Sequence, residues 1–325
     1  MQSRFSLSVM AAALGLALTL ASQAASAQNG NSTVTVTQQG NGNTANADQA
    51  LSSYAEGTVS ATITQTGDHN HVGGPGATTG GIHQMNVDGV DAVIRQTGAG
   101  NNAGIAQRDV ITDRLYPVTA EIAQVGSRNT ATLLQTHGSD LHAVMVQGGS
   151  GNNAAVEQEG SGPGTTRTTQ NGNDNSLTLS QRGTTIWGMS IIQEGDGNVA
   201  SALADNNGYG AARIAQTGTA NYASTLQTNT IFATFSIVQG GSDNLAQASQ
   251  SDGLSQVINI GQNGSGNVAT VSQTRASTDS AGSLDSAIIA QLGNSNTAIV
   301  RQVGQRYMAN VSQTGSGNYT NIYQH

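Results

Sequence analysis

Residues 120–135 have the sequence AEIAQVGSRNTATLLQ, in which small or apolar residues and glutamine alternate with other residues on both sides of Gly126. Alternation with a period of two indicates a β-strand with one buried face. The stretch therefore predicts a strand, a tight arc at the glycine and a second strand. The residues expected to point inward are Ala120, Ile122, Gln124, Asn129, Ala131, Leu133 and Gln135.

The same pattern recurs along the chain as the motif Gln-x-Gly-x-x-Asn, which occurs twelve times. From Gln124 to Gln262 the copies are 23 residues apart without exception, and ten copies carry a further Gln eleven residues after the first. A fixed period of this length is typical of solenoids. We therefore predict an all-β solenoid of about twelve strand-arc-strand rungs, which become cross-β amyloid on assembly. The expected repeat domain covers 28–325, with repeats that start near residues 34, 61, 92, 120, 143, 166, 189, 212, 235, 258, 287 and 309.

A single repeat of this kind cannot fold alone. Ordering the backbone of 23 residues costs roughly 23 to 46 kcal/mol, whereas burying about four small apolar side chains returns on the order of 8 kcal/mol. Stacking rungs about 4.8 Å apart lets each strand form hydrogen bonds above and below, and aligns each inward amide with its copy in the next rung. Such a ladder satisfies amides whose burial without a partner costs about 1 to 3 kcal/mol each.

The candidate site residues are the inward amides and the glycines of the arcs. The predicted self-assembly ladder consists of Gln38, Asn43, Gln49, Gln124, Asn129, Gln135, Gln262, Asn267, Gln273, Gln313, Asn318 and Gln324. The arc glycines, where we expect positive φ or a close backbone approach, are Gly40, Gly126, Gly264 and Gly315.

Irregularities in the period mark expected loops. An eight-residue insertion near 73–80 places Ile82 and Gln84 on the second strand of the second repeat, and extra turn residues lie near 50–57, 109–117 and 276–285. Every proline falls in such a loop or turn, where it does not interrupt a ladder of backbone hydrogen bonds. Charged residues have outward parity in every strand, and Asp285 is expected at a rim.

The first 27 residues have the features of a secretory signal peptide. A single early charge at Arg4 precedes an uncharged run, and Ala25-Ser26-Ala27 is a small-x-small cleavage site. We therefore expect a secreted chain that starts near Gln28, with no membrane span. The net charge of -8 argues against nucleic acid as a partner. Because the chain has no cysteine, its stability does not come from disulfides.

The extended pattern Gln-x-Gly-x-x-Asn-x-Ala-x-x-x-Gln is intact at 124–135 and 262–273 and resembles the curlin repeat of curli fibre subunits. The resemblance covers 34–324. It implies an extracellular functional amyloid of the biofilm matrix of a Gram-negative bacterium, exported through an outer-membrane secretion pore and polymerised on a nucleator subunit. It also implies that inward Gln and Asn residues of the terminal repeats drive assembly. The serine that usually lies six residues before the first Gln is present only as Ser32.

The ends of the expected mature chain favour polymerisation. The first strand begins within a few residues of Gln28, and the last strand contains Gln324. Two open strand edges with the same inward pattern form a template for another copy, so we expect head-to-tail growth of a fibre. The alternative is a monomeric secreted solenoid that acts as an adhesin or binds a glycan or ice.

Other residue patterns give weaker indications of chemistry. His69 and His71 have ligand-like spacing, but no cysteine or carboxylate pair completes a metal site, so loop histidines are the preferred interpretation. We expect neither a cofactor nor an enzyme activity. The remaining patterns that we interpret as structural are Ser139-Asp140-x-His142, the glycine-rich stretch 261–266, Trp187, Tyr319 and Tyr323.

Overall fold

The computed structural model describes residues 5–11, 17–18, 31–52, 57–73, 81–111, 118–160, 162, 164–183, 188–274 and 285–325. The chain divides into two compact units, Met1–Thr166 and Arg167–His325. Throughout the described ranges the regular elements are β-strands. Residues 53–56, 74–80, 112–117 and 275–284, which make up most of the expected loops, lie outside the described residues, as do all three prolines and Trp187.

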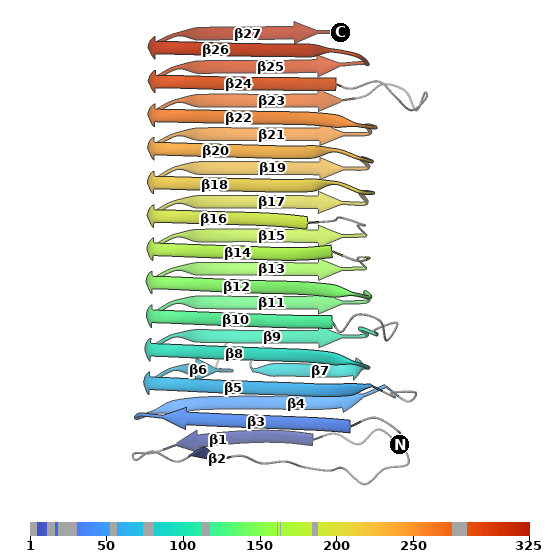
Figure 1. The fold of residues 1–325 in the computed structure, drawn as a ribbon, viewed down its shortest axis with the longest axis vertical. Coiled ribbons are helices and arrows are strands. Elements are labelled where there is room, and N and C mark those ends of the chain that lie inside the picture. Colours follow the sequence, from blue (N-terminus) through green and yellow to red (C-terminus); the bar gives the residue numbers. More distant parts are fainter. Residues whose placement is uncertain are drawn as a thin grey trace. The chain divides into compact units, whose positions relative to one another are not determined.

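The first unit contains two sheets in which the strands of the repeats run parallel, and we call them the first-strand sheet and the second-strand sheet after the order of the strands in each repeat (Figure 1). The first-strand sheet has the order β3 (Asn31–Gln39), β5 (Thr58–Asp68), β8 (Val90–Ala99), β10 (Val118–Ser127) and β12 (Leu141–Ser150). The second-strand sheet contains β4 (Asn43–Leu51), the short strands β6 (His71–Val72) and β7 (Ile82–Val87), β9 (Asn102–Arg108), β11 (Thr130–Thr136) and β13 (Asn153–Glu159).

The second unit is built in the same way, and β14 begins just before its first residue. Its first-strand sheet has the order β14 (Gly164–Asn173), β16 (Gly188–Asp196), β18 (Ala211–Thr219), β20 (Thr234–Ser242), β22 (Gln256–Ser265), β24 (Asp285–Asn294) and β26 (Met308–Ser316). Its second-strand sheet has the order β15 (Ser176–Arg182), β17 (Val199–Asp205), β19 (Tyr222–Thr228), β21 (Leu245–Ser251), β23 (Val268–Thr274), β25 (Thr297–Val303) and β27 (Tyr319–Gln324).

The pairing register joins equivalent positions of adjacent repeats. In the first unit Gln124 pairs with Gln147, and in the second unit Gln250 pairs with Gln273. Because every strand pairs in parallel with its copy in the next repeat, each repeat forms one rung of strand, arc and strand. The predicted all-β solenoid is therefore confirmed.

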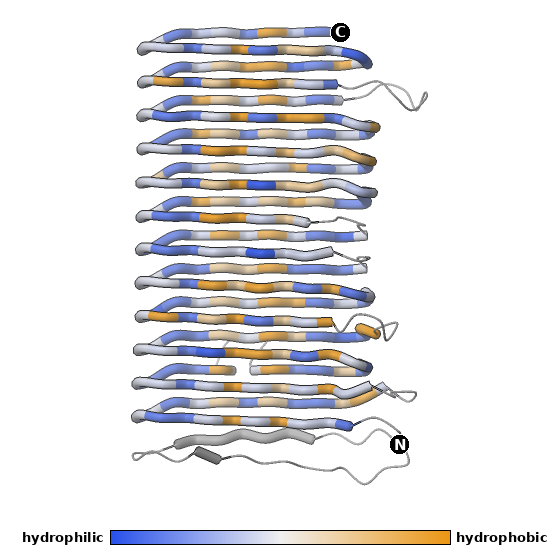
Figure 2. The backbone as a smooth tube through the Cα atoms, in the orientation of Figure 1, coloured by the Kyte–Doolittle hydropathy of each residue, from blue (hydrophilic) through white to orange (hydrophobic). Residues whose placement is uncertain are grey.

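Inward positions of both sheets are buried except in the last strand, β27, where they are partly buried. Large and small side chains balance within a repeat. Thr168 on β14 shares its repeat with Leu177 and Leu179 on β15, whereas Phe235 on β20 shares its repeat with Ala246 on β21. Close packing requires a nearly constant side-chain volume in each rung, which explains why a small residue on one strand accompanies a large one on the other. Figure 2 shows the resulting mixture of apolar and polar residues along single strands.

The arcs between the two strands require glycine for two reasons. Gly126 has a φ of 117°, and a Cβ atom there would lie 2.0 Å from the carbonyl oxygen of Gly149 in the next rung. Gly264 has a φ of 125° and the same close approach, to Gly293. Both the left-handed conformation and the contact between neighbouring backbones exclude a side chain.

The second repeat contains the expected insertion. Its second strand is divided into β6, in which Val72 pairs with Ala45, and β7, in which Ile82 pairs with Ala47 and Gln84 with Gln49. The divided strand keeps the inward positions in register, because the extra residues lie between its two parts.

The expected signal peptide includes two described strands, β1 (Phe5–Ala11) and β2 (Ala17–Leu18). They pair antiparallel with β4 and β3, respectively, in contrast to the parallel pairing of the repeats. The other residues of 1–27 lie outside the described part of the chain.

Charged side chains follow the expected outward parity, but the expected rim position of Asp285 is more enclosed than the sequence indicates. Asp285 is 2% exposed, and its carboxylate accepts a hydrogen bond from the backbone N–H of Tyr307 at 3.0 Å. Asp88 is similarly buried and accepts from the N–H of Gly57 at 2.6 Å. These carboxylates replace missing strand contacts at the turns, which explains their burial.

Candidate self-assembly ladders

The first Gln of each repeat forms a hydrogen-bonded column inside each unit. In the first unit the Nε2 atom of each Gln donates to the Oε1 atom of the Gln one rung later, from Gln38 to Gln65 at 2.6 Å and onward to Gln147. In the second unit the same bonds run from Gln170 to Gln313 at 2.8 to 2.9 Å. Every donor therefore points toward the later repeat, and the ladder has a direction.

The direction of this ladder follows from the backbone. Gln216 Nε2 also donates to the carbonyl oxygens of Val199 and Asn221, both at 3.0 Å. If the side-chain amide of Gln216 were turned over, its Oε1 would face these two carbonyl oxygens, and oxygen cannot donate a hydrogen bond to oxygen. The amide therefore has only one favourable orientation. Its Oε1 is then left to accept from the preceding rung.

The Asn column has the opposite direction. Asn244 donates from Nδ2 to Asn221 Oδ1 of the preceding rung at 2.9 Å, and from the same nitrogen to the carbonyl oxygen of Gly264 in the following arc at 2.9 Å. The backbone N–H of Asn244 also donates to Asn221 Oδ1. The Asn side chain thus binds the neighbouring arcs together, since it contacts the rung on either side.

The second Gln of each repeat forms a third column, which is interrupted in the second unit. In the first unit it runs from Gln49 to Gln158 at 2.6 to 2.9 Å. In the second unit Ala204 occupies the position between Gln181 and Gln227. Gln227 Oε1 is buried without a hydrogen-bond partner, and its Nε2 is 3.5 Å from Gln250 Oε1. The missing donor at Ala204 accounts for the unpaired acceptor.

In the outermost rungs the ladder residues have different hydrogen-bond partners. Among the described residues, Gln38 Oε1 at the beginning of the first column has no hydrogen-bond partner. At the other end of the chain, Gln313 Nε2 donates to Thr297 O at 2.9 Å and Thr320 Oγ1 at 3.1 Å. Gln49 Oε1 accepts from Ser32 Oγ, so this serine takes the place of a preceding rung.

The structure places the predicted ladder residues in these three columns. All twelve predicted positions form hydrogen bonds to the equivalent residue of a neighbouring rung, and the last of them, Gln324, accepts from Gln302 at 2.8 Å. The predicted arc glycines have φ values between 103° and 125°. Their role in assembly stays a prediction.

Sequence reasoning did not identify a further set of contacts on the outside of the arcs. Asp68 Oδ1 accepts from the backbone N–H of Asn41 at 2.8 Å, and Asp196 Oδ1 accepts from Asn173 at 2.8 Å. The signal is an Asp or Asn three residues after the first Gln of the repeat. Such residues satisfy backbone donors that the arc leaves without a strand partner.

The described residues that we considered for other chemistry lie in the stacked columns or the turns. His71 Nδ1 is 2.8 Å from Thr44 Oγ1, and His142 Nδ1 is 2.9 Å from Thr119 Oγ1. Within the described ranges no group of three or more His, Cys, Asp or Glu residues could hold a metal ion. Tyr323 stacks on His325 at a centroid distance of 4.8 Å and lies beneath the guanidinium group of Arg301.

No model of a known protein family matches the chain, and no curated protein matches it either. In the part of the chain that the structure describes, no helix has the length and apolarity that crossing a bilayer requires. A solenoid with stacked Gln and Asn ladders fits a self-assembling or adhesin-like role.

Proposed function

We propose that this chain is the structural subunit of an extracellular, curli-like amyloid fibre that supports adhesion and biofilm formation, and that it has no enzyme activity. The observation that carries the proposal is the set of directional amide ladders, which end at the outermost rungs. The resemblance of the repeat to the curlin repeat supports the same assignment. Export through an outer-membrane pore and polymerisation on a nucleator subunit belong to this proposal.

The chemistry of the two ends supports head-to-tail growth. The first Gln column begins with an unpaired acceptor, Gln38 Oε1, and ends with Gln313, whose Nε2 donates to Thr297 O and Thr320 Oγ1. In a fibre, Gln313 Nε2 would also donate to Gln38 Oε1 of the next copy, as Gln216 Nε2 donates to Gln239 beside two further acceptors. In the Asn column the polarity is reversed, so Asn318 Oδ1 would accept from Asn43 of the next copy. Head-to-head contact would bring amide oxygens together, which is unfavourable. Only the head-to-tail arrangement continues all columns with donors facing acceptors.

Removal of the signal peptide is part of the same proposal. In the full-length chain, β1 and β2 pair with the edge strands β4 and β3. Cleavage after Ala27 would expose the backbone groups of both edge strands. An exposed edge with an unbroken inward pattern is a template for strand addition.

Elongation of seeds tests this assignment. We expect Gln313→Ala to slow the elongation of preformed wild-type seeds and to raise the critical concentration by roughly 5- to 150-fold, because one junction acceptor loses its donor. Gln324→Ala should act similarly through the other Gln column. Thioflavin fluorescence and fibre diffraction with a reflection near about 4.8 Å provide the measurements.

The matched control is Gln262→Ala, which makes the same change in the middle of the second unit. Its effect on folding is measured separately by urea-induced unfolding of the monomer. Equal elongation defects for the terminal and internal variants would reject templating by the terminal rung. A wild-type chain that stays monomeric at high concentration would instead favour a monomeric adhesin.

A further inference from the structure

An apolar ridge runs along the outer face of the second-strand sheet in the second unit. Val199, Tyr222, Leu245 and Val268 occupy one column, because each pairs in register with the next. Val199 and Tyr222 are each 37% exposed. All four face outward, beside a column of the polar residues Ser201, Ser224, Gln247 and Thr270.

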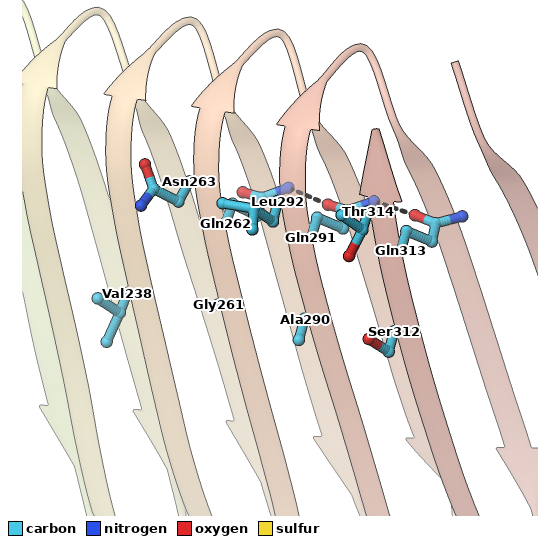
Figure 3. Close-up of a pocket in the computed structure, with 10 residues that line it drawn as sticks. All are labelled: Val238, Gly261, Gln262, Asn263, Ala290, Gln291, Leu292, Ser312, Gln313 and Thr314. Atoms are coloured by element: carbon cyan, nitrogen blue, oxygen red, sulfur yellow. Dashed lines mark hydrogen bonds between the residues drawn. The ribbon is translucent and has the colours of Figure 1, made fainter. Parts of the chain in front are cut away.

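A groove runs in the same direction on the outer face of the first-strand sheet of this unit. Its floor is a column of three small residues, Gly261, Ala290 and Ser312, which pair in register. Val238 lies at one end of the floor and Leu292 lies beside it (Figure 3). The hollow has a volume of about 430 Å³. The side chains beside the floor are Asn263, Leu292 and Thr314. Val238 and Leu292, which are 44% and 55% exposed, are the apolar part of the rim.

The ridge and the groove consist of uncharged residues, although the chain has a net charge of -8 and Asp205 ends β17 at an outward position. On the ridge face, the outward positions from Val199 to Leu203 and their partners on β19, β21 and β23 are uncharged. On the groove face, the outward positions of β20, β22, β24 and β26 are also uncharged. Two copies can therefore approach through these faces without repulsion between like charges.

We propose that the groove binds the ridge of a second copy of this chain, so that neighbouring fibres associate side by side. This inference rests on the proposed function as a fibre subunit. Ridge and groove both repeat with the spacing of the rungs, about 4.8 Å, so a ridge residue can meet each step of the groove. Because ridge and groove are different surfaces, the contact is heterologous and continues from fibre to fibre without closing.

The small size of each contact explains why the association depends on fibre formation. Four strands at a spacing of about 4.8 Å and seven residues at about 3.3 Å cover roughly 450 Å² on each partner. A stable pair of proteins usually buries about 800 Å² per partner. One contact is therefore weak, whereas a fibre repeats the contact once per subunit and gains from multivalency. We expect monomers to remain separate and fibres to form bundles.

Filling the groove tests the proposal without altering the ladders. A Cβ atom at Gly261 would be 3.9 Å from its nearest neighbour, Ile289 O, so the strand has room for a side chain. We expect the double variant Gly261→Val, Ala290→Val to form fibres at the wild-type rate but not to form bundles. Electron microscopy, in which wild-type fibres should appear bundled, provides the measurement. Ala123→Val, at the equivalent outward position of β10 in the first unit, is the control and should leave bundling unchanged. Equal bundling of all variants would overturn the inference.

Disulfide cross-linking tests the identity of the two surfaces, because the chain has no cysteine of its own. We expect fibres that mix Leu245→Cys and Ala290→Cys chains to form disulfide dimers, and fibres of either variant alone to form few. Cross-linking by the Leu245→Cys chain alone would show a ridge-to-ridge contact and overturn the assignment, as would the absence of mixed dimers. Fibres without mixed dimers reject only this inference, whereas a chain that forms no fibres rejects the proposed function as well.

Discussion

The two Gln columns of the second unit have the same chemistry but differ in continuity. The first-strand column has a Gln in every rung from Gln170 to Gln313, with N–O distances of 2.8 to 2.9 Å. The second-strand column is interrupted at Ala204, and the next Gln has an unpaired buried oxygen and a 3.5 Å contact. One substitution therefore disturbs the rung that follows it.

This difference shows that a buried amide depends on both of its neighbours. A neutral amide can be buried at little cost when its oxygen and nitrogen are both paired, but leaving either one unpaired costs about 1 to 3 kcal/mol. Because the ladder is directional, loss of one residue leaves an acceptor unpaired in the next rung. The same logic applies at the outermost rung, where a second copy can supply the missing partner.

The largest effect is expected when the continuous column is broken. Gln239→Ala removes the donor to Gln262 Oε1, a bond of 2.8 Å. Gln227→Ala makes the same change at a residue that is equally buried. It removes the unpaired Oε1 of Gln227, but it also removes the donor to Gln250 Oε1. We expect Gln239→Ala to destabilise the chain by about 1 to 3 kcal/mol more than Gln227→Ala. Urea-induced unfolding of the monomeric protein provides the measurement.

The comparison between these two variants cancels the cavity that each truncation leaves. A difference below about 0.5 kcal/mol, or a larger loss for Gln227→Ala, would show that continuity of the column does not determine the energy of its members.

Repair of the interrupted column should have a smaller effect of the opposite sign. Ala204→Gln would donate to Gln227 Oε1, and the neighbouring Gln residues show that this column accommodates the side chain. We expect a gain of about 1 to 3 kcal/mol from the satisfied oxygen, reduced by the conformational entropy that the new side chain loses on burial. A rise in the unfolding midpoint is the expected readout.

Ala202→Gln is the matched control for this repair. Ala202 is equally buried on the same strand, but its column pairs it with Leu179 and Thr225 and offers no continuous amide ladder. The control should be destabilised. If both variants gained stability, added side-chain volume and not the ladder would explain the repair.

Much of this architecture could be predicted from the sequence, because a period of two within strands and of 23 between repeats determines which residues point inward and which residues align. The gap at Ala204 can also be read from the repeat. The sequence does not predict that this gap leaves Gln227 Oε1 unpaired. The direction of the ladder determines which atom loses its partner, and this direction depends on backbone carbonyl groups beside residues such as Gln216. The burial of Asp285 depends on the turn geometry, and the groove at Gly261 depends on side chains in several rungs.

The smallest effect is expected for a polar pair outside the ladders. Arg95 on β8 and Glu121 on β10 form an ion pair between adjacent rungs, as the ladder amides do, but their side chains are 55% and 38% exposed. Water solvates both groups after the pair is broken, so neither becomes an unpaired buried atom. We expect Glu121→Gln to change the stability by less than about 0.5 kcal/mol, and this change to shrink further in high salt. A loss as large as that of Gln239→Ala, measured by the same urea unfolding, would show that contact between rungs and not burial makes the ladders strong.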